Sequence, residues 1–301
     1  MQKIIPHLWF DKEAKQAAEF YTSIFPNSKI TSSQVLHDTP SGDADVIYFE
    51  LSGFSFAAIS AGPYFVLNPS ISFFLNFDPS KDPKAQENLD ALWEKLSESG
   101  TALMPLDAYP FSKRYGWIKD KFGVSWQLIL TDPEGDERPF IVPSFLFVGK
   151  VYGQLDEAID FYTSVFKNAK RGQTARYPAG MEPDKEGNIM FADFTLEGQW
   201  FAAMESAHEH KFFFNEAVSL IVECEDQAEI DYYWEKLSAV KESEQCGWLK
   251  DKYGVSWQIV PKSMNEMMAK GTPEQMKRVT EAFLQMKKFD LKKLEEAYNQ
   301  G

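Results

Sequence analysis

The segment Gly116–Gln127, GWIKDKFGVSWQ, recurs almost unchanged as Gly247–Gln258, GWLKDKYGVSWQ. These two copies lie 131 residues apart, whereas an earlier pair, FYTSIF at 20–25 and FYTSVF at 161–166, lies 141 residues apart. The second copy of the repeat is therefore ten residues shorter, and the missing stretch corresponds to the region around 103–114. A period of this length exceeds the roughly 20 to 50 residues of a solenoid repeat. The repeat predicts two duplicated domains.

Each half of the chain combines strands with helices. Short aromatic-rich runs at 5–10 and 144–148 are typical of strands, and each is followed by apolar residues at helical spacing. The order strand, helix, strands then occurs twice in each half. This order predicts an α+β fold built from paired βαβββ units.

A linker rich in proline, glycine and charge separates the halves, and a tail follows the second half. The expected regions are a first domain at 1–135, a second domain at 140–262 and a C-terminal helical tail at 263–301. The tail carries two capping boxes, SMNE at 263–266 and TPEQ at 272–275, which favour helices. Its apolar stripe, which includes Val279 and Phe283, is expected to cover a sheet or a domain boundary.

Charge and composition exclude several classes of function. The chain has 301 residues, with 31 Lys and Arg against 45 Asp and Glu, so its formal net charge is −14. A chain this acidic, without a basic cluster, disfavours nucleic acid and anionic membrane surfaces as partners. No apolar run approaches the ~18 residues of a membrane span. The N-terminal residues MQKIIPH lack the apolar core of a signal peptide, so we do not expect secretion. Two cysteines are too few for a disulfide framework or a zinc cluster. We therefore expect a cytoplasmic protein.

The opening sequence PHLWF at 6–10, the helix that ends FYTSIFPNS at 20–28, and the closing GWLKDKYGVSWQ resemble the PhnB-like family. That family is also labelled 3-demethylubiquinone-9 3-methyltransferase-like. It belongs to the vicinal oxygen chelate superfamily, with glyoxalase, bleomycin-resistance and extradiol dioxygenase proteins. The resemblance covers nearly the whole chain, twice. It implies two tandem glyoxalase/bleomycin-resistance-type domains, each with paired βαβββ units that form a cupped mixed sheet around a cavity.

The resemblance also implies where a divalent metal would be held in metal-binding relatives. His7 stands at the position of the opening-strand histidine, and Gln127 stands where a glutamate usually closes the unit. In the second half Phe145 is expected at the histidine position and Gln258 at the glutamate position, with Glu205 near the end of the intervening strand. Three or more protein ligands are normal for a catalytic metal. His7 and Gln127 are therefore metal candidates that would hold an ion only weakly, and no cofactor is assigned.

A second possible metal site is the sequence His208-Glu209-His210, whose two imidazoles would face one way in an extended segment. Solvation in a loop is the competing interpretation. Cys246 has no base or helix N-terminus near it in the sequence, so we expect an inert thiol. The chain also lacks a glycine-rich turn of the GxGxxG kind. The sequence therefore does not support an S-adenosylmethionine methyltransferase, despite the family label.

The family geometry places the alternating faces of the opening and closing strands around the cup. The candidate ligand-binding residues are His7, Trp9, Ser125, Gln127, Phe145, Phe147, Ser256 and Gln258. Aromatic walls with a few uncharged polar groups suit a small, partly apolar ligand. The alternative interpretation is that these aromatic side chains only fill the core.

Two functions remain open at this stage. The first is a small-molecule-binding protein of unknown specific activity, whose catalytic role is undecided. The alternative is a metal-dependent lyase, isomerase or dioxygenase that uses the first domain. Single-domain relatives commonly form homodimers, so we expect the two halves to form a pseudo-dimer within one chain, which would itself be a monomer or a homodimer.

Overall fold

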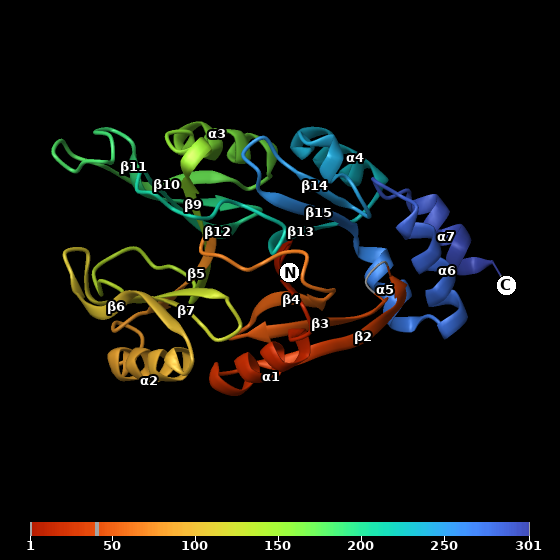
Figure 1. Ribbon diagram of the computed structural model, residues 1–301, viewed down its shortest axis with the longest axis horizontal. Helices are drawn as coiled ribbons and strands as arrows, with labels where there is room; N and C mark the ends of the chain where they lie inside the picture. Colours follow the sequence, from red (N-terminus) through yellow and green to blue (C-terminus); the bar gives the residue numbers. More distant parts are fainter. Residues whose placement is uncertain (1, 40–41, 301) are drawn as a thin grey trace.

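The computed structural model describes residues 2–39 and 42–300 (Figure 1). The first half contains β1 (Ile4–Phe10), α1 (Ala14–Ile24), β2 (Lys29–Thr39), β3 (Gly42–Leu51), β4 (Phe54–Ser60), β5 (Ile71–Phe77), α2 (Ala85–Ser97), β6 (Thr101–Tyr109), β7 (Ser112–Lys119) and β8 (Ser125–Leu130). The second half contains β9 (Ile141–Val148), α3 (Leu155–Val165), β10 (Lys170–Arg176), β11 (Ile189–Leu196), β12 (Gln199–Ser206), β13 (Val218–Cys224), α4 (Gln227–Leu237), β14 (Trp248–Lys250) and β15 (Ser256–Pro261). The tail contains α5 (Lys262–Lys270), α6 (Pro273–Leu284) and α7 (Leu291–Asn299).

The strands form two cupped sheets. The seven-stranded sheet has the order β14-β15-β13-β1-β4-β3-β2, and the eight-stranded sheet has the order β10-β11-β12-β9-β5-β8-β7-β6. The expected α+β fold with repeated units is confirmed. The ten residues that the second half lacks correspond to most of the hairpin β6–β7, which has only the short β14 as its counterpart.

Both sheets are built from both halves of the chain. In the seven-stranded sheet β1 pairs antiparallel with β13, so that His7 lies opposite Ser219. In the eight-stranded sheet β5 pairs antiparallel with β9, so that Ser72 lies opposite Ser144. Each sheet therefore joins the first unit of one half to the second unit of the other. The two halves are held together by continuous backbone hydrogen bonding as well as by side-chain packing.

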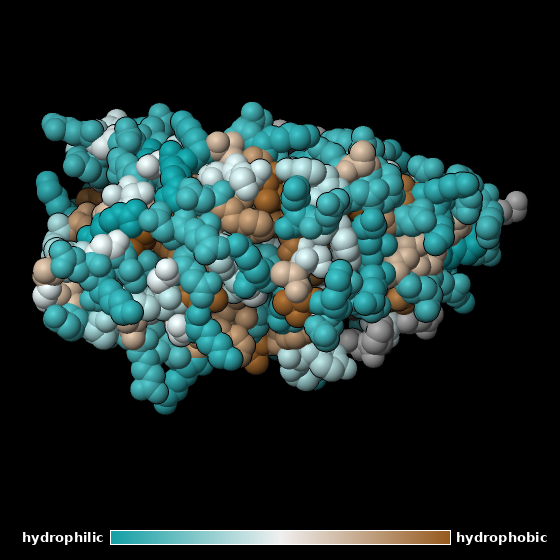
Figure 2. All heavy atoms as spheres, turned by 90° about the horizontal axis from the view of Figure 1, so that it is seen from above, coloured by the Kyte–Doolittle hydropathy of each residue, from teal (hydrophilic) through white to brown (hydrophobic). Residues whose placement is uncertain are grey.

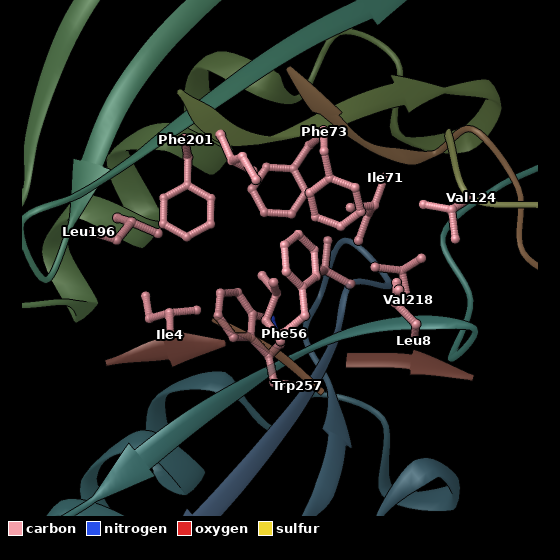
Figure 3. Close-up of a cluster of buried hydrophobic side chains, with 14 of the residues drawn as sticks. Ile4, Leu8, Phe56, Ile71, Phe73, Val124, Leu196, Phe201, Val218 and Trp257 are labelled. Carbon is pink, nitrogen blue, oxygen red and sulfur yellow. The ribbon is translucent and has the colours of Figure 1, made fainter. Parts of the chain in front are cut away.

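One large hydrophobic core lies between the two sheets (Figure 3). Phe56 of the seven-stranded sheet packs edge-to-face on Phe73 of the eight-stranded sheet, with ring centroids 5.0 Å apart. Both side chains are fully buried, and burial of each stabilises the fold by roughly 1.5 to 3 kcal/mol. Because side chains alternate along a strand, Leu8 enters this core while His7 and Trp9 face the other side of the sheet, the inside of the cup.

The repeated sequence motifs meet in a buried hydrogen-bond network, once in each half. Asp120 Oδ2 accepts hydrogen bonds from the Tyr21 hydroxyl at 2.7 Å and from Trp126 Nε1 at 2.8 Å. Asp251 accepts the equivalent bonds from Tyr162 at 2.7 Å and Trp257 at 2.9 Å. The other oxygen of each aspartate accepts two backbone N–H groups of its own turn. This network ties the first helix of each half to the closing turn of the same half.

The tail lies at one end of the molecule, over the cup of the seven-stranded sheet (Figure 1). Val279 and Phe283 of α6 pack in one hydrophobic cluster with Ile5, Ile221 and Val260 of the sheet. The expectation that the apolar stripe covers a sheet is confirmed. The capping box at 272–275 is also formed. The capping box expected at 263–266 is wrong, because the N-cap of α5 is Pro261, two residues before Ser263, and it makes no side-chain hydrogen bond.

The surface is largely hydrophilic in the space-filling view, with apolar residues showing mainly in the hollows between polar ones (Figure 2). Within residues 2–39 and 42–300, no helix has the length and apolar character needed to cross a membrane.

Candidate functional site

A cavity of about 360 Å³ lies between the cup of the seven-stranded sheet and the helices α5 and α6. Its walls are mostly apolar and aromatic. They include Trp9, Leu36, Val46, Tyr48, Ile59, Ile221, Trp248, Met264, Met268 and Phe283. A larger hollow of about 690 Å³ lies between α1 and α2, but the ion-paired Lys81 and Glu137 on its wall make it a solvated surface groove. The cavity against the seven-stranded sheet, with its more apolar and aromatic walls, is the better candidate site for a small molecule.

Three uncharged polar side chains lie together on the sheet at the cavity. Gln258 Nε2 donates a hydrogen bond to Ser219 Oγ at 2.9 Å, and Ser219 Oγ lies 3.4 Å from His7 Nδ1. Strand pairing brings these residues together. Ser219 lies on β13, which pairs with β1 so that Ser219 is opposite His7, and β13 also pairs with β15, the strand that carries Gln258. The Ser219 hydroxyl can donate to Nδ1 when the imidazole proton is on Nε2, and it accepts from Nδ1 in the other tautomer.

Burial keeps His7 uncharged. The side chain is 5% exposed, and burial lowers the pKa of its imidazole from 6.5 to about 3. The ring packs edge-on against Trp248, with centroids 5.4 Å apart. The indole of Trp9, held by a 2.8 Å hydrogen bond from Nε1 to the carbonyl of Gly62, lies on the same wall. His7 therefore acts as a neutral hydrogen-bonding group in an aromatic environment.

Other polar groups at the cavity are engaged with protein partners or have raised pKa values. Asn265 of α5 accepts a hydrogen bond from the Tyr48 hydroxyl at 3.4 Å and donates one to Glu223 at 2.9 Å. Burial raises the pKa of Tyr48 to about 12. Burial also raises the pKa of the Cys246 thiol, so the thiol stays protonated. These groups close the cavity on the tail side without adding charge to it.

The structure places the sequence-predicted residues in three different surroundings. His7, Trp9 and Gln258 line the cavity. Ser256 is buried next to it in β15 without lining it. Ser125 and Gln127 lie on the eight-stranded sheet, where Trp117 Nε1 donates to Ser125 Oγ at 2.7 Å.

Phe145 and Phe147 are placed differently from the expectation. The β9 residue opposite Ser72 is Ser144, just as His7 is opposite Ser219, so Ser144 and not Phe145 is the counterpart of His7. A slip of one residue reverses the face on which every side chain of a strand lies. Phe145 and Phe147 therefore point into the core, where Phe147 packs on Phe214 at 5.2 Å between ring centroids.

The eight-stranded sheet carries an equivalent polar group that is already satisfied. Gln127 donates to Ser72 Oγ at 2.8 Å, and its Oε1 accepts a 2.5 Å hydrogen bond from the Tyr115 hydroxyl. Cys246 occupies the sequence position of Tyr115 in the second half, and a thiol cannot reach across as the phenol does. Ser144 Oγ, which replaces the imidazole, is buried without a partner among the described residues. The two cups therefore differ in the groups they can offer to a ligand.

The donor set does not fit a divalent metal. His7 and Gln127, the candidate ligands, lie in different sheets, so the structure does not bring them together. Beside His7 the sheet offers Ser219 and Gln258, while its neighbour Ala57 is apolar. Throughout the described chain, no group of three or more His, Cys, Asp and Glu side chains is placed to hold an ion. Three or more ligands are the norm, and this cup offers one imidazole and one amide.

The other metal candidates have structural roles or separate partners. Glu205 accepts backbone hydrogen bonds from Gly153 at 2.6 Å and Ile189 at 2.7 Å, and so anchors the segment before α3. His208 lies 3.7 Å from a carboxylate oxygen of Asp184, whereas His210 lies 3.1 Å from Ser206 Oγ. The two imidazoles of the His-Glu-His sequence are thus each paired with a different neighbour.

The cavity does not fit S-adenosylmethionine either. Sites for that cofactor use an acidic side chain to bind the ribose hydroxyls, as dinucleotide sites do. No aspartate or glutamate lines the cavity among the residues that the structure describes. The sequence argument against this cofactor and the donor set of the cavity agree.

Several residues of the site were missed from the sequence. Trp248 lies within the repeated closing motif, so its position on the cup follows once the strand pairing is known. Met264, Asn265 and Met268 come from the tail, which has no repeat partner. The apolar stripe of the tail was the signal that could have placed them over a sheet.

Comparisons with known proteins place this geometry among relatives. A family model described as 3-demethylubiquinone-9 3-methyltransferase matches residues 2–129 and again residues 139–260. The PhnB protein from Bacillus cereus is 36% identical over 43% of this chain and 100% of its own, with a TM-score of 0.39. Glyoxalase I from Zea mays is 12% identical over 88% of this chain and 96% of its own, with a TM-score of 0.52, which shows a likeness of fold. No match was found among curated proteins.

Proposed function

We propose that this chain, which belongs to the PhnB-like family of the vicinal oxygen chelate superfamily, binds a small, partly apolar molecule in the cup of the seven-stranded sheet. The model of the PhnB-like family carries the name 3-demethylubiquinone-9 3-methyltransferase. The observation that carries the proposal is the 360 Å³ cavity beneath α5 and α6. It combines aromatic walls with His7 and Gln258, two polar groups whose outer atoms have no protein partner among the described residues. Pockets for small ligands have this composition.

The metal-dependent lyase, isomerase or dioxygenase is not part of this proposal, and neither is methyl transfer. Both chemistries need groups that the cavity residues do not supply, as the donor sets above indicate. Binding without an assigned reaction is the function that the site supports best.

We also propose that the two repeats, 1–135 and 140–262, act as one pseudo-dimeric unit in the cytoplasm, as a monomer or as a homodimer of such units. The two shared sheets support this arrangement, because separation of the halves would expose the edges of β1, β5, β9 and β13. The tail at 263–301 completes one cup of the pair. Light scattering tests the proposal, and an obligate trimer or larger ring would refute it.

The test of ligand binding is a thermal-shift screen of aromatic, antibiotic and quinone-like compounds against two variants. Ile59→Trp places a large side chain in the cavity, and Met204→Trp makes the equivalent change in the other cup. We expect hits that raise the melting temperature of the wild type and of Met204→Trp but not of Ile59→Trp. The absence of any hit, or hits that bind all three proteins equally, would refute the proposal.

A further inference from the structure

The cavity of the seven-stranded sheet contains no ionised side chain. Among the described residues that line it there is no aspartate, glutamate, lysine or arginine. His7 is held neutral by burial, and the polar groups that remain are amides, hydroxyls and a thiol. A charged ligand would lose its hydration on entry and find no counter-charge.

Two complementary polar atoms in the cavity lack protein partners. Gln258 uses its Nε2 for Ser219, so its Oε1 remains as an acceptor. Ser219 Oγ faces Nδ1 of His7, and we assign the imidazole proton to the other ring nitrogen, Nε2, the tautomer in which the Ser219 hydroxyl donates to Nδ1 and Nε2 is a donor. Within the described residues neither Oε1 of Gln258 nor Nε2 of His7 has a hydrogen-bond partner. A ligand that fills the space between them must offer an acceptor and a donor side by side.

The other cup shows that these free atoms depend on particular residues. There the Tyr115 hydroxyl occupies Oε1 of Gln127, and Ser144 replaces the imidazole. Cys246 and His7 are the corresponding residues in the cavity, and they leave both atoms open. The two repeats have thus diverged at the positions that decide whether a polar ligand group can bind.

The surroundings disfavour anions further. Glu223 lies behind Asn265, which donates to its carboxylate, and the chain carries a formal net charge of −14. A cation would meet the aromatic side chains of Trp9 and Trp248 but no carboxylate among the described residues that line the cavity. An uncharged ligand avoids both costs, since its polar atoms need only the two hydrogen bonds.

Resting on the proposed function, we propose that the natural ligand is an uncharged, flat apolar molecule with an adjacent hydrogen-bond acceptor and donor, bound between His7 Nε2 and Gln258 Oε1. A primary amide or a neutral hydroxy-carbonyl compound has this pattern. The cavity discriminates against the ionised forms of the same skeleton. The eight-stranded cup does not bind this class, because its glutamine is already satisfied.

Three probes of the same shape test whether the cavity prefers an uncharged ligand to its ionised forms. They are 2-naphthamide, 2-naphthoate and 2-naphthamidinium, which are neutral, anionic and cationic at pH 7.5. Calorimetric titration of the full chain is expected to show one 2-naphthamide per chain, with each ionised probe at least about tenfold weaker. His7→Phe keeps an aromatic ring but removes the donor, and it should weaken 2-naphthamide about fivefold to tenfold. Ser144→Ala, at the equivalent position of the other cup, should change nothing.

The outcomes separate this inference from the proposed function. If either ionised probe binds the wild type as tightly as 2-naphthamide does, and Ile59→Trp abolishes this binding, the cavity binds ligands but the inferred preference for uncharged ligands is wrong. If 2-naphthamide binding is unchanged in both His7→Phe and Gln258→Leu, the assigned polar pair is wrong. If no probe binds, the proposed function fails and the inference fails with it.

Discussion

Replacement of His7 by glutamine should reduce the loss in the free energy of unfolding that the protein shows at acidic pH. Glutamine is uncharged over the whole range, and its amide can still hydrogen-bond to Ser219. His7 has a folded-state pKa of about 3, below the 6.5 of an exposed imidazole. As the pH falls, the unfolded chain therefore takes up the proton before the folded chain does. The contribution of His7 to stability is complete above pH ~6.5 and is lost between that pH and ~3.

The magnitude follows from these two pKa values. At pH 4.5 the unfolded imidazole is almost fully protonated, while the folded one is almost entirely neutral, so linkage removes about 3 kcal/mol from the free energy of unfolding relative to neutral pH. Tyr48 and Cys246, the titratable neighbours in the cavity, have raised pKa values and do not change charge in this range. Asp251, whose pKa burial raises to about 6, changes stability in the opposite direction, but it does so equally in both proteins.

Urea unfolding at pH 7.5 and pH 4.5, followed by tryptophan fluorescence and by circular dichroism, measures the effect. We expect the free energy of unfolding of the wild type to fall between these pH values by about 3 kcal/mol more than that of His7→Gln. His208→Gln, a change at an exposed histidine of a surface loop, is the control and should follow the wild type closely. An equal loss in the free energy of unfolding of the wild type and of His7→Gln would show that the imidazole takes up its proton in the folded state. That result would refute the apolar environment assigned to His7.

Other parts of the structure give sharp predictions as well. Asp251→Asn should reduce the free energy of unfolding by about 3 kcal/mol, because the amide cannot accept all four hydrogen bonds, and Tyr162→Phe by about 1 kcal/mol; equal stability of Asp251→Asn and wild type in urea would contradict the buried network. Phe283→Ala, which opens the contact between α6 and the sheet, should cost about 3 kcal/mol and increase binding of a hydrophobic dye; an unchanged melting temperature would mean that the tail is not docked. Added Ni²⁺ or Zn²⁺ should leave the melting temperature of the wild type within one or two degrees of the metal-free value, since the cup offers too few ligands; a saturable rise that His7→Gln abolishes would restore the metal-dependent alternative.

The local units of the fold could be predicted from the sequence, and their pairing could not. The repeated motifs mark the same Tyr, Asp and Trp in both halves, and each motif works within its own half. The antiparallel pairing of β1 with β13, which puts His7 beside Ser219, joins residues more than 200 positions apart. No local pattern records such a contact, so the sequence alone left open which unit completes each cup.

The candidate site was predictable to the same extent. His7, Trp9 and Gln258 followed from alternation along strands and from the family pattern. Phe145 was misassigned, although IVPSFLF aligns with IIPHLWF without a gap through Pro143 and Pro6, an alignment that pairs Ser144 with His7. The register opposite Ser72 confirms this alignment. Asn265 could not be found, because the tail meets the cup only through tertiary packing.

The most direct test of ligand binding in the seven-stranded cup is a crystal structure of the full chain soaked with 2-naphthamide. We predict one molecule beneath α5 and α6, with its carboxamide between His7 Nε2 and Gln258 Oε1 and its rings against Trp9 and Trp248. A molecule bound only in the eight-stranded cup or on the surface, with the cavity left empty, would contradict the proposed function.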